Sequence, residues 1–133
     1  MKMEKGEKEI FKVERISART NVIAYIKVAE EQNANLLLTN QRILFLAREL
    51  ITGKEGALRK EIWIKDIVDV QKTNAYGITP SIKISYREDG KVKNTEITLN
   101  PEVFNIKHLI RLNIGCRKDE RDKLFEALKK VIE

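Results

Sequence analysis

Most of the chain alternates between hydrophobic and polar positions with a period of two, the pattern of β-strands that bury one face. Residues 22–28 alternate in this way, and residues 82–87 repeat the pattern with isoleucine and tyrosine on one face. Asp89 and Gly90 follow, and glycine accepts the positive φ that a tight hairpin turn requires. Residues 92–99 return as the partner strand, so the pattern predicts an antiparallel hairpin.

Other segments also predict strands. Residues 36–46 are apolar on both faces except at 39–42, where threonine and asparagine favour a chain reversal, so the segment predicts a second hairpin of central strands. Residues 61–65 predict another strand, which continues over 67–70 after a bend. The glycine pair within 52–56 predicts a loop, which lacks the Gly-Lys-Ser/Thr ending of a phosphate-binding loop.

The period changes to that of an α-helix at the C-terminus. Over 119–133 the apolar residues form one helical stripe of Leu124, Phe125, Leu128, Val131 and Ile132. Asp119 has the chemistry of an N-cap, and the lysines at 129 and 130 have the charge that suits a helix C-terminus. We expect this helix to cover an open end of the β-structure. The alternative is a helix that docks on a membrane or a partner, although the stripe is narrow and has no tryptophan.

The composition indicates one domain without catalytic machinery. A chain of 133 residues with 42% hydrophobic residues can build one core. One cysteine and one histidine exclude an intramolecular disulfide, a multi-cysteine zinc site and any pair of imidazoles. His108 lies among apolar neighbours, so we assign it a structural or surface role. Cys116 precedes the helix without a general base signalled near it, so we take it as a buried thiol and not a nucleophile. We therefore predict no enzyme activity, no metal site and no cofactor.

The net charge of the chain gives little information about a binding partner. The net charge is +6, but acidic and basic residues are interleaved and aromatic residues make up only 6%, so nucleic-acid binding is disfavoured. Weak attraction to an anionic membrane surface remains compatible with the excess. The abundance of charged residues resembles that of hyperthermophile proteins. The start of the chain is charged and no apolar run approaches the ~20 residues that span a bilayer, so we expect a cytoplasmic protein.

Three segments carry a resemblance to a known family. Residues 36–45, Leu-Leu-Leu-Thr-Asn-Gln-Arg-Ile-Leu-Phe, resemble the "apolar-x-Leu-Thr-x-x-Arg-apolar-apolar-Phe" signature of GRAM-like and bacterial pleckstrin-homology-like (PH-like) domains. Residues 6–11 resemble the "Gly-Glu-x-apolar" opening of such domains, and residues 62–70 resemble their "apolar-x-x-Ile-x-x-Val" strand and bend. The resemblance covers residues 6–133, and the order of the elements agrees with it.

The resemblance implies an α+β fold in a single domain, residues 1–133. This would be a PH-like barrel of two nearly orthogonal antiparallel sheets with about seven strands over about 6–115, capped by one C-terminal α-helix over about 119–132. Two departures stand out. Asn35 lies where many relatives have glycine, and 101–116 is longer and more apolar than a simple connection, so we expect an extra strand there.

Such domains bind partners through loops and sheet edges, so we expect a binding or scaffold module rather than an enzyme. Trp63 lies between two isoleucines, and since neighbours on a strand face opposite sides, it is either a contact residue or part of the core. We take Trp63, Phe104 and Ile106 as candidate protein contacts. The partner is a protein or a second copy of this chain, because bacterial domains with this pattern tend to form homo-oligomers.

The alternative function is peripheral binding to anionic lipid head groups. In PH domains, basic residues around the first two strands commonly contact these head groups, and Lys12, Arg15 and Arg19 surround the corresponding connection here. Glu14 interrupts this group, and scattered surface charges are usually solvated or paired. Nucleic acid is a less favoured alternative.

Overall fold

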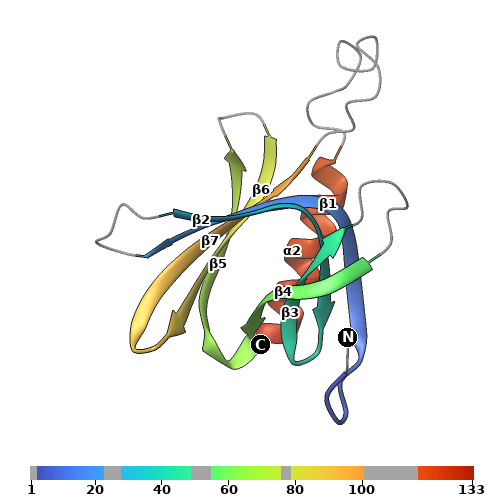
Figure 1. Ribbon diagram of the computed structural model, residues 1–133, viewed down its shortest axis with the longest axis vertical. Coiled ribbons are helices and arrows are strands. Elements are labelled where there is room, and N and C mark those ends of the chain that lie inside the picture. The colour runs from blue at the N-terminus through green and yellow to red at the C-terminus, as the bar shows by residue number, and fades with distance from the viewer. Residues whose placement is uncertain (1–2, 23–27, 49–54, 76–78, 101–116) are drawn as a thin grey trace.

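The structure, a computed structural model, describes residues 3–22, 28–48, 55–75, 79–100 and 117–133. In this part of the chain seven strands form one antiparallel sheet, and a single α-helix follows them (Figure 1). The elements are β1 (Glu9–Val22), β2 (Val28–Thr39), β3 (Arg42–Arg48), β4 (Glu55–Trp63), the 3₁₀ turn η1 (Ile64–Asp66), β5 (Ile67–Ala75), β6 (Thr79–Glu88), β7 (Lys91–Leu99) and α2 (Lys118–Ile132). This confirms the predicted α+β class and its antiparallel strands.

The strand order in the sheet is β4-β3-β2-β1-β7-β6-β5, so β4 and β5 are its edges. These two edges do not pair with each other, and the sheet is not closed among the described residues. β1 is shared by both halves of the sheet: it pairs with β2 along its length and with β7 from Ile16 onward. A bulge between Val13 and Ile16 interrupts β1, and Arg15 within it has a φ of 55°.

Both predicted hairpins are confirmed. β6 and β7 pair from Ser81↔Thr98 to Glu88↔Lys91, and the turn between them has positive φ at Asp89 (53°) and Gly90 (74°). β2 and β3 pair in the same antiparallel manner across the turn at 39–42.

Other predictions need correction. Residues 22 and 28 lie on two paired antiparallel strands, so the alternation over 22–28 does not mark a single strand. The predicted loop ends earlier than 56, because β4 already begins at Glu55 and pairs with β3 there. The predicted strand 61–65 ends at Trp63, where η1 begins. Arg117, not Asp119, occupies the N-cap position of α2, and Asp119 lies in the first helical turn. The predicted extra strand over 101–116 lies outside the described residues.

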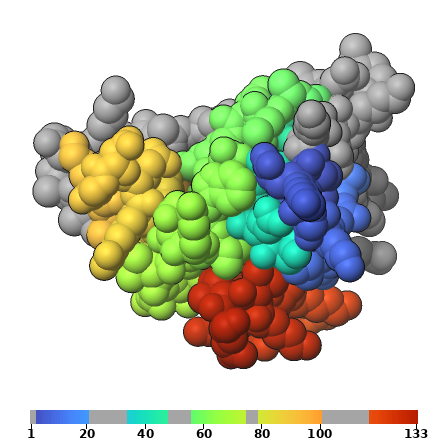
Figure 2. Space-filling model, turned by 90° about the horizontal axis from the view of Figure 1, so that it is seen from below, coloured from blue at the N-terminus to red at the C-terminus, as the bar shows by residue number. Residues whose placement is uncertain are grey.

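The core lies between the curled sheet and α2, which packs against the strands on one side (Figure 2). Leu124 and Leu128 are fully buried in the main core cluster, and the rest of the predicted stripe packs against it. The helix therefore covers an end of the β-structure as predicted. No helix of the described ranges combines the length and the apolar character needed to cross a bilayer.

Candidate binding site

A buried ion network joins the N-terminal segment to β3 and β4. The Arg42 guanidinium donates to both oxygens of Glu7, with Nε at 2.8 Å from Oε2 and Nη2 at 3.0 Å from Oε1, and its Nη1 donates to Glu61 Oε2 at 2.6 Å. Thr39 Oγ1 donates to Glu7 Oε2 at 2.6 Å. The hydrogen bond from Arg42 is the main cause that lowers the pKa of Glu7 to about 2. The network gives a physical role to the Gly-Glu opening and to the threonine and arginine of the Leu-Thr-x-x-Arg pattern.

This network also positions Trp63. The guanidinium carbon of Arg42 lies 5.2 Å from the centroid of the indole ring, and Lys65 Nζ lies 6.0 Å from it. Ile62 is buried in the core and Ile64 packs against it, because β4 ends between them and the backbone turns into η1. Both isoleucines therefore face inward, and Trp63 is left half-buried at the corner between the edge strands.

Two hollows flank this corner. In Figure 2 the segment from β4 to β5 (green) lies between the β6–β7 hairpin (yellow) and the N-terminal residues (blue). The hollow toward the hairpin has a volume of about 550 Å³ and is called the acidic hollow here; it is lined by Glu61, Ile62, Trp63, Asp66, Tyr86, Arg87, Glu88, Asp89 and Gly90. The second hollow has a volume of about 440 Å³ and is lined by Asn40, Gln41, Trp63, Ile64 and Lys65. Trp63 lines both.

The acidic hollow carries four carboxylates against one guanidinium, a formal charge of −3 in a chain whose net charge is +6. Two of the carboxylates are already paired: Glu61 binds Arg42, and Glu88 Oε1 accepts a hydrogen bond from Lys93 Nζ at 2.5 Å. Asp66 and Asp89 have no ion pair within the described part of the chain. The Lys93 ammonium also interacts electrostatically with Asp89, so the chain's own cations compensate part of the negative charge of the hollow.

Tyr86 lines the same hollow and adds a buried polar group. It is only 2% exposed, and its hydroxyl has no hydrogen-bond partner among the residues described. A buried polar group without a partner is uncommon in folded proteins. The hydroxyl oxygen is itself inaccessible to solvent, so it lies behind the surface of the hollow and not on it.

Lys60 connects several strands in the interior, next to the hollow. Its Nζ donates to Thr20 Oγ1 at 2.7 Å and approaches Thr95 Oγ1 at 3.4 Å, and it lies 5.3 Å from the centroid of the Tyr86 ring. The two threonine hydroxyls also bond each other at 2.9 Å. No carboxylate of the described residues contacts this ammonium. Lys60 thus links β4 to β1, β6 and β7 across the interior, beside the place where the sheet does not close.

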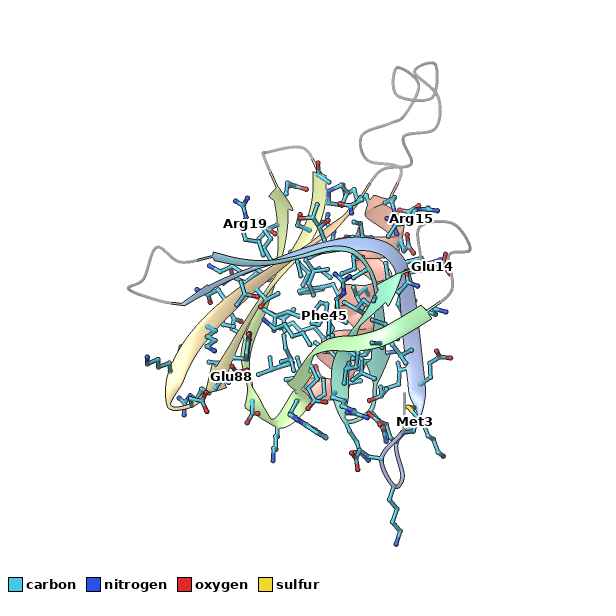
Figure 3. All side chains as sticks on the ribbon, viewed as in Figure 1. Met3, Glu14, Arg15, Arg19, Phe45 and Glu88 are labelled. Atoms are coloured by element: carbon cyan, nitrogen blue, oxygen red, sulfur yellow. The ribbon has the colours of Figure 1, made fainter. Side chains whose placement is uncertain are left out.

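The predicted basic residues on β1 are not brought together into a hollow. Lys12 and Arg19 are exposed, Arg15 is half-buried in the bulge, and none of the three lines either hollow. Figure 3 shows Arg15 and Arg19 at different ends of the curved part of β1. Each of the three residues already takes part in an interaction.

Arg117 fixes the β1 bulge from the helix side. Its guanidinium donates to the backbone carbonyls of Glu14, Arg15 and Asn100 at 2.6, 2.9 and 2.7 Å. The side chain is buried, so these three bonds replace water at backbone carbonyls near the bulge; the Arg15 carbonyl also accepts from the Asn100 N–H at 3.0 Å. Sequence reasoning missed this contact, because Arg117 reads only as a basic residue before the helix.

Of the predicted protein contacts, Trp63 lies at the corner described above, whereas Phe104 and Ile106 lie outside the described residues, as do His108 and Cys116. Lys60 and Tyr86 were missed, although the alternation of β4 places residue 60 on the same face as the core residue Ile62 and could have shown that Lys60 points inward. Among the described residues, no group of three or more His, Cys, Asp or Glu side chains could hold a metal ion. The arrangement offers an aromatic side chain and two hollows, which are means of binding.

Comparisons with known proteins add a likeness of fold. No family model matches the sequence, and no curated protein matches it. The described fold is similar to a solved structure, the hSac2 domain from the human phosphoinositide phosphatase Sac2, with a TM-score of 0.55 and 13% sequence identity. The match covers 97% of this chain and 72% of that chain. At this identity the likeness concerns the fold alone, and it extends over nearly the whole of this chain.

Proposed function

We propose that this chain is a non-catalytic binding module that associates with protein, including a second copy of itself, through the surface around Trp63. The observation that carries the proposal is the half-buried indole of Trp63, which lies close to the cationic groups of Arg42 and Lys65 and lines both hollows. Tryptophan and arginine are enriched among the residues that contribute most to protein interfaces. An aromatic side chain that is already fixed in place loses little conformational entropy when a partner covers it.

The edge strand β4, which ends at Trp63, supports the proposal that the partner is a protein. β4 pairs only with β3 in the described sheet, so its other side presents backbone groups that an added strand can bond. Leu58 on this strand is 40% exposed, which adds apolar surface next to the edge. Self-association is the simplest form of the proposal, because a second copy presents an edge of the same kind.

Light scattering at micromolar concentration, at low and at high salt, tests this proposal. We expect a dimer or a larger assembly for the unaltered chain. For Trp63→Ala we expect the dissociation constant of the assembly to rise at least about tenfold, because truncating a central aromatic residue commonly costs more than 1 kcal/mol of binding free energy. Ile10→Ala is the matched control, since Ile10 is an exposed apolar residue that lines neither hollow at this corner. A monomeric unaltered chain, or an equal effect of Ile10→Ala, contradicts self-association through this surface.

Binding to anionic lipid head groups is the second candidate. It is supported by the net charge of +6, which attracts an anionic surface. Lys12, Arg15 and Arg19 remain candidate contacts for head groups on the surface of β1. The fold neighbour comes from a phosphoinositide phosphatase, which is compatible with this candidate. Sedimentation with anionic vesicles tests it: binding that falls steeply with salt favours this function over the first.

We also propose that the chain is a GRAM-like, PH-like domain whose sheet halves lie nearly orthogonal and curl as a barrel, and that it works in the cytoplasm. The contacts of Glu7, Thr39 and Arg42 support the family assignment, because the residues that carry the resemblance bind one another. The long, bulged β1, which serves both halves, supports the curled arrangement. The single cysteine agrees with a reducing compartment.

A further inference from the structure

We infer, on the basis of the proposed function, that two associated copies of the chain exchange their residues 3–8, so that Glu7 of one copy binds Arg42 of the other. Residues 3–8 are called the strap here. They precede β1 and include the buried carboxylate of the ion network described above. In the exchanged assembly each copy completes the ion network of the other.

The strap is attached to the rest of the chain by polar contacts and not by apolar packing. Glu7 is its only buried residue, and the others are exposed, including Met3 at 37%. The strap folds on itself in a turn, in which Gly6 has a φ of 76° and Glu7 N donates to Glu4 O at 3.0 Å. Its release hydrates one ion pair but uncovers little apolar surface, so it can open while the core stays folded.

The backbone of the strap is held by the turn between β2 and β3. The Asn40 side chain accepts from Lys8 N at 2.8 Å and donates to Gly6 O at 3.1 Å, and Asn40 N donates to Lys8 O at 3.0 Å. Gln41 Nε2 donates to Lys5 O at 2.9 Å. These bonds recognise an extended backbone whatever its side chains, as in sites that bind linear peptides.

The Glu7 carboxylate supplies the contact that depends on a side chain. Arg42 binds both of its oxygens, and the Thr39 hydroxyl donates to one of them. Two-pronged contacts between a guanidinium and a carboxylate are strong and geometrically specific. All hydrogen bonds of the strap outside its own turn therefore go to residues 39–42 within the described ranges, and these four residues are called the receptor here. A strap from a second copy fits the receptor as well as the chain's own strap does.

The receptor lies on the surface through which we propose that the chain associates. Asn40 and Gln41 line the second hollow together with Trp63, and Gln41 O accepts from Ile64 N at 3.0 Å. Figure 2 shows the N-terminal residues (blue) beside the β4–β5 segment (green). Six extended residues span about 20 Å. When two copies meet at Trp63, each strap can reach the receptor of the other copy.

The exchange preserves every contact of the strap, because both copies have the same sequence. Its cost falls on the joint between Lys8 and the start of β1, where both residues are exposed. In return, two straps that cross between the copies hold the assembly together. The exchanged form is therefore favoured as the protein concentration rises.

Cross-linking of the full chain tests the exchange directly, at a concentration where light scattering shows assembly. Lys5→Cys with Gln41→Cys places two thiols where the receptor bonds the strap, and Cys116→Ser removes the only natural cysteine of the sequence. A short bismaleimide then joins each strap to the receptor that holds it. On a denaturing gel we expect covalent dimer as the main product, whereas a chain that keeps its own strap gives linked monomer.

The matched control is Ser85→Cys with Asn94→Cys, also with Cys116→Ser. Ser85 and Asn94 face each other on β6 and β7 of one chain, and their side chains are 2.6 Å apart. This pair should give linked monomer only, under the conditions in which the strap pair gives dimer.

Mixing two variants tests the same exchange through charge. Glu7→Gln has a neutral strap and an intact receptor, and Arg42→Met has an intact strap and a neutral receptor. When the two are unfolded and refolded together, exchange places Glu7 against Arg42 at one site and the two neutral side chains together at the other. We expect the mixture to unfold at a higher urea concentration than either variant alone. In the control mixture Glu9→Gln, at an exposed position outside the strap, replaces Glu7→Gln, and this mixture should unfold as the sum of its components.

Two results overturn the inference: linked monomer as the main product of the strap pair, or a mixture of Glu7→Gln and Arg42→Met that unfolds as the sum of its components. If these two variants do not refold, the cross-linking result decides, because its substitutions lie outside the ion network.

The proposed function fails separately. If assembly depends on Trp63 while the strap pair gives linked monomer, association through this surface stands and the exchange is wrong. If the strap pair gives covalent dimer while Trp63→Ala assembles like the unaltered chain, the exchange stands and the Trp63 surface is wrong. A chain that is monomeric throughout contradicts both.

Discussion

Replacing Glu7 with glutamine removes one negative charge from a buried network while it preserves the size and shape of the side chain. The Glu7 side chain has 0% exposure, and the Arg42 side chain has 5%. After the replacement, Arg42 still has its ion pair with Glu61, but the Glu61 side chain is 36% exposed. A buried guanidinium that loses its buried carboxylate is poorly compensated, so we expect a large loss of folding stability.

The pKa of Glu7 gives the magnitude. The hydrogen bond from Arg42, with smaller contributions from Thr39 and the backbone of Glu4, lowers this pKa from 4.5 to about 2. One pKa unit corresponds to about 1.4 kcal/mol, so the ionised carboxylate contributes about 3 kcal/mol to folding at neutral pH. The folded pKa is the lower one. The contribution is therefore complete above about pH 5 and is lost as the pH falls from there to about 2.

Urea denaturation followed by Trp63 fluorescence at several pH values between 7 and 2 measures this effect. We expect Glu7→Gln to lower the free energy of unfolding by about 3 kcal/mol at pH 7 and by much less near pH 2, where about half of the unaltered Glu7 is protonated in the folded state. Glu9→Gln is the control, because Glu9 is exposed, and it should stay within about 0.5 kcal/mol. A loss below about 1 kcal/mol for Glu7→Gln, or a loss that does not shrink in acid, would refute the reasoning.

Two further predictions concern contacts that hold the sheet. Lys60→Met keeps the aliphatic stem but removes the ammonium that bonds Thr20 and lies over Tyr86. We expect urea denaturation to show a loss of about 1–2 kcal/mol in the free energy of unfolding. An unchanged or higher stability would show that the contacts of Lys60 do not stabilise the fold. Arg117→Met removes the guanidinium donor from three backbone carbonyls, of which only that of Arg15 keeps a second donor, the Asn100 N–H, so we expect a cost of about 2–4 kcal/mol in the same assay. Lys118→Met, at an exposed neighbour, should cost less than about 0.5 kcal/mol; equal losses would contradict the role of Arg117 at the bulge.

The local elements could be predicted from the sequence because their signals lie within a few residues of one another. The Asp89–Gly90 turn needs only a residue that tolerates positive φ, and the stripe of α2 needs only a period of 3.6. The prediction of a single strand over 22–28 was wrong because it, too, used only the pattern of neighbouring residues. Two antiparallel strands that follow each other can keep the period of two, and nothing in the pattern marks the reversal between them.

The candidate site could be predicted only in part. Trp63 was recognisable as a lone aromatic residue in an apolar strand, but its exposure depends on where β4 ends, which the pattern of 61–65 does not show. The acidic hollow combines residues of the β4–η1 corner with residues of the β6–β7 turn, and only the folded sheet brings these together. Lys60 and Arg117 were missed because their partners are distant in the chain and are neutral hydroxyls or carbonyls, which carry no sequence signal of pairing.

The position of β1 between the two halves of the sheet has a consequence for how the chain folds. β1 comes first from the N-terminus, yet its second neighbour is β7, the last of the described strands before α2. The hairpins β2–β3 and β6–β7 are local and can form early, whereas the β1–β7 ladder requires a large loop to close. While the chain is being synthesised, residues 16–22 of β1 present an open edge until β7 emerges, and that interval is when we expect aggregation to compete with folding.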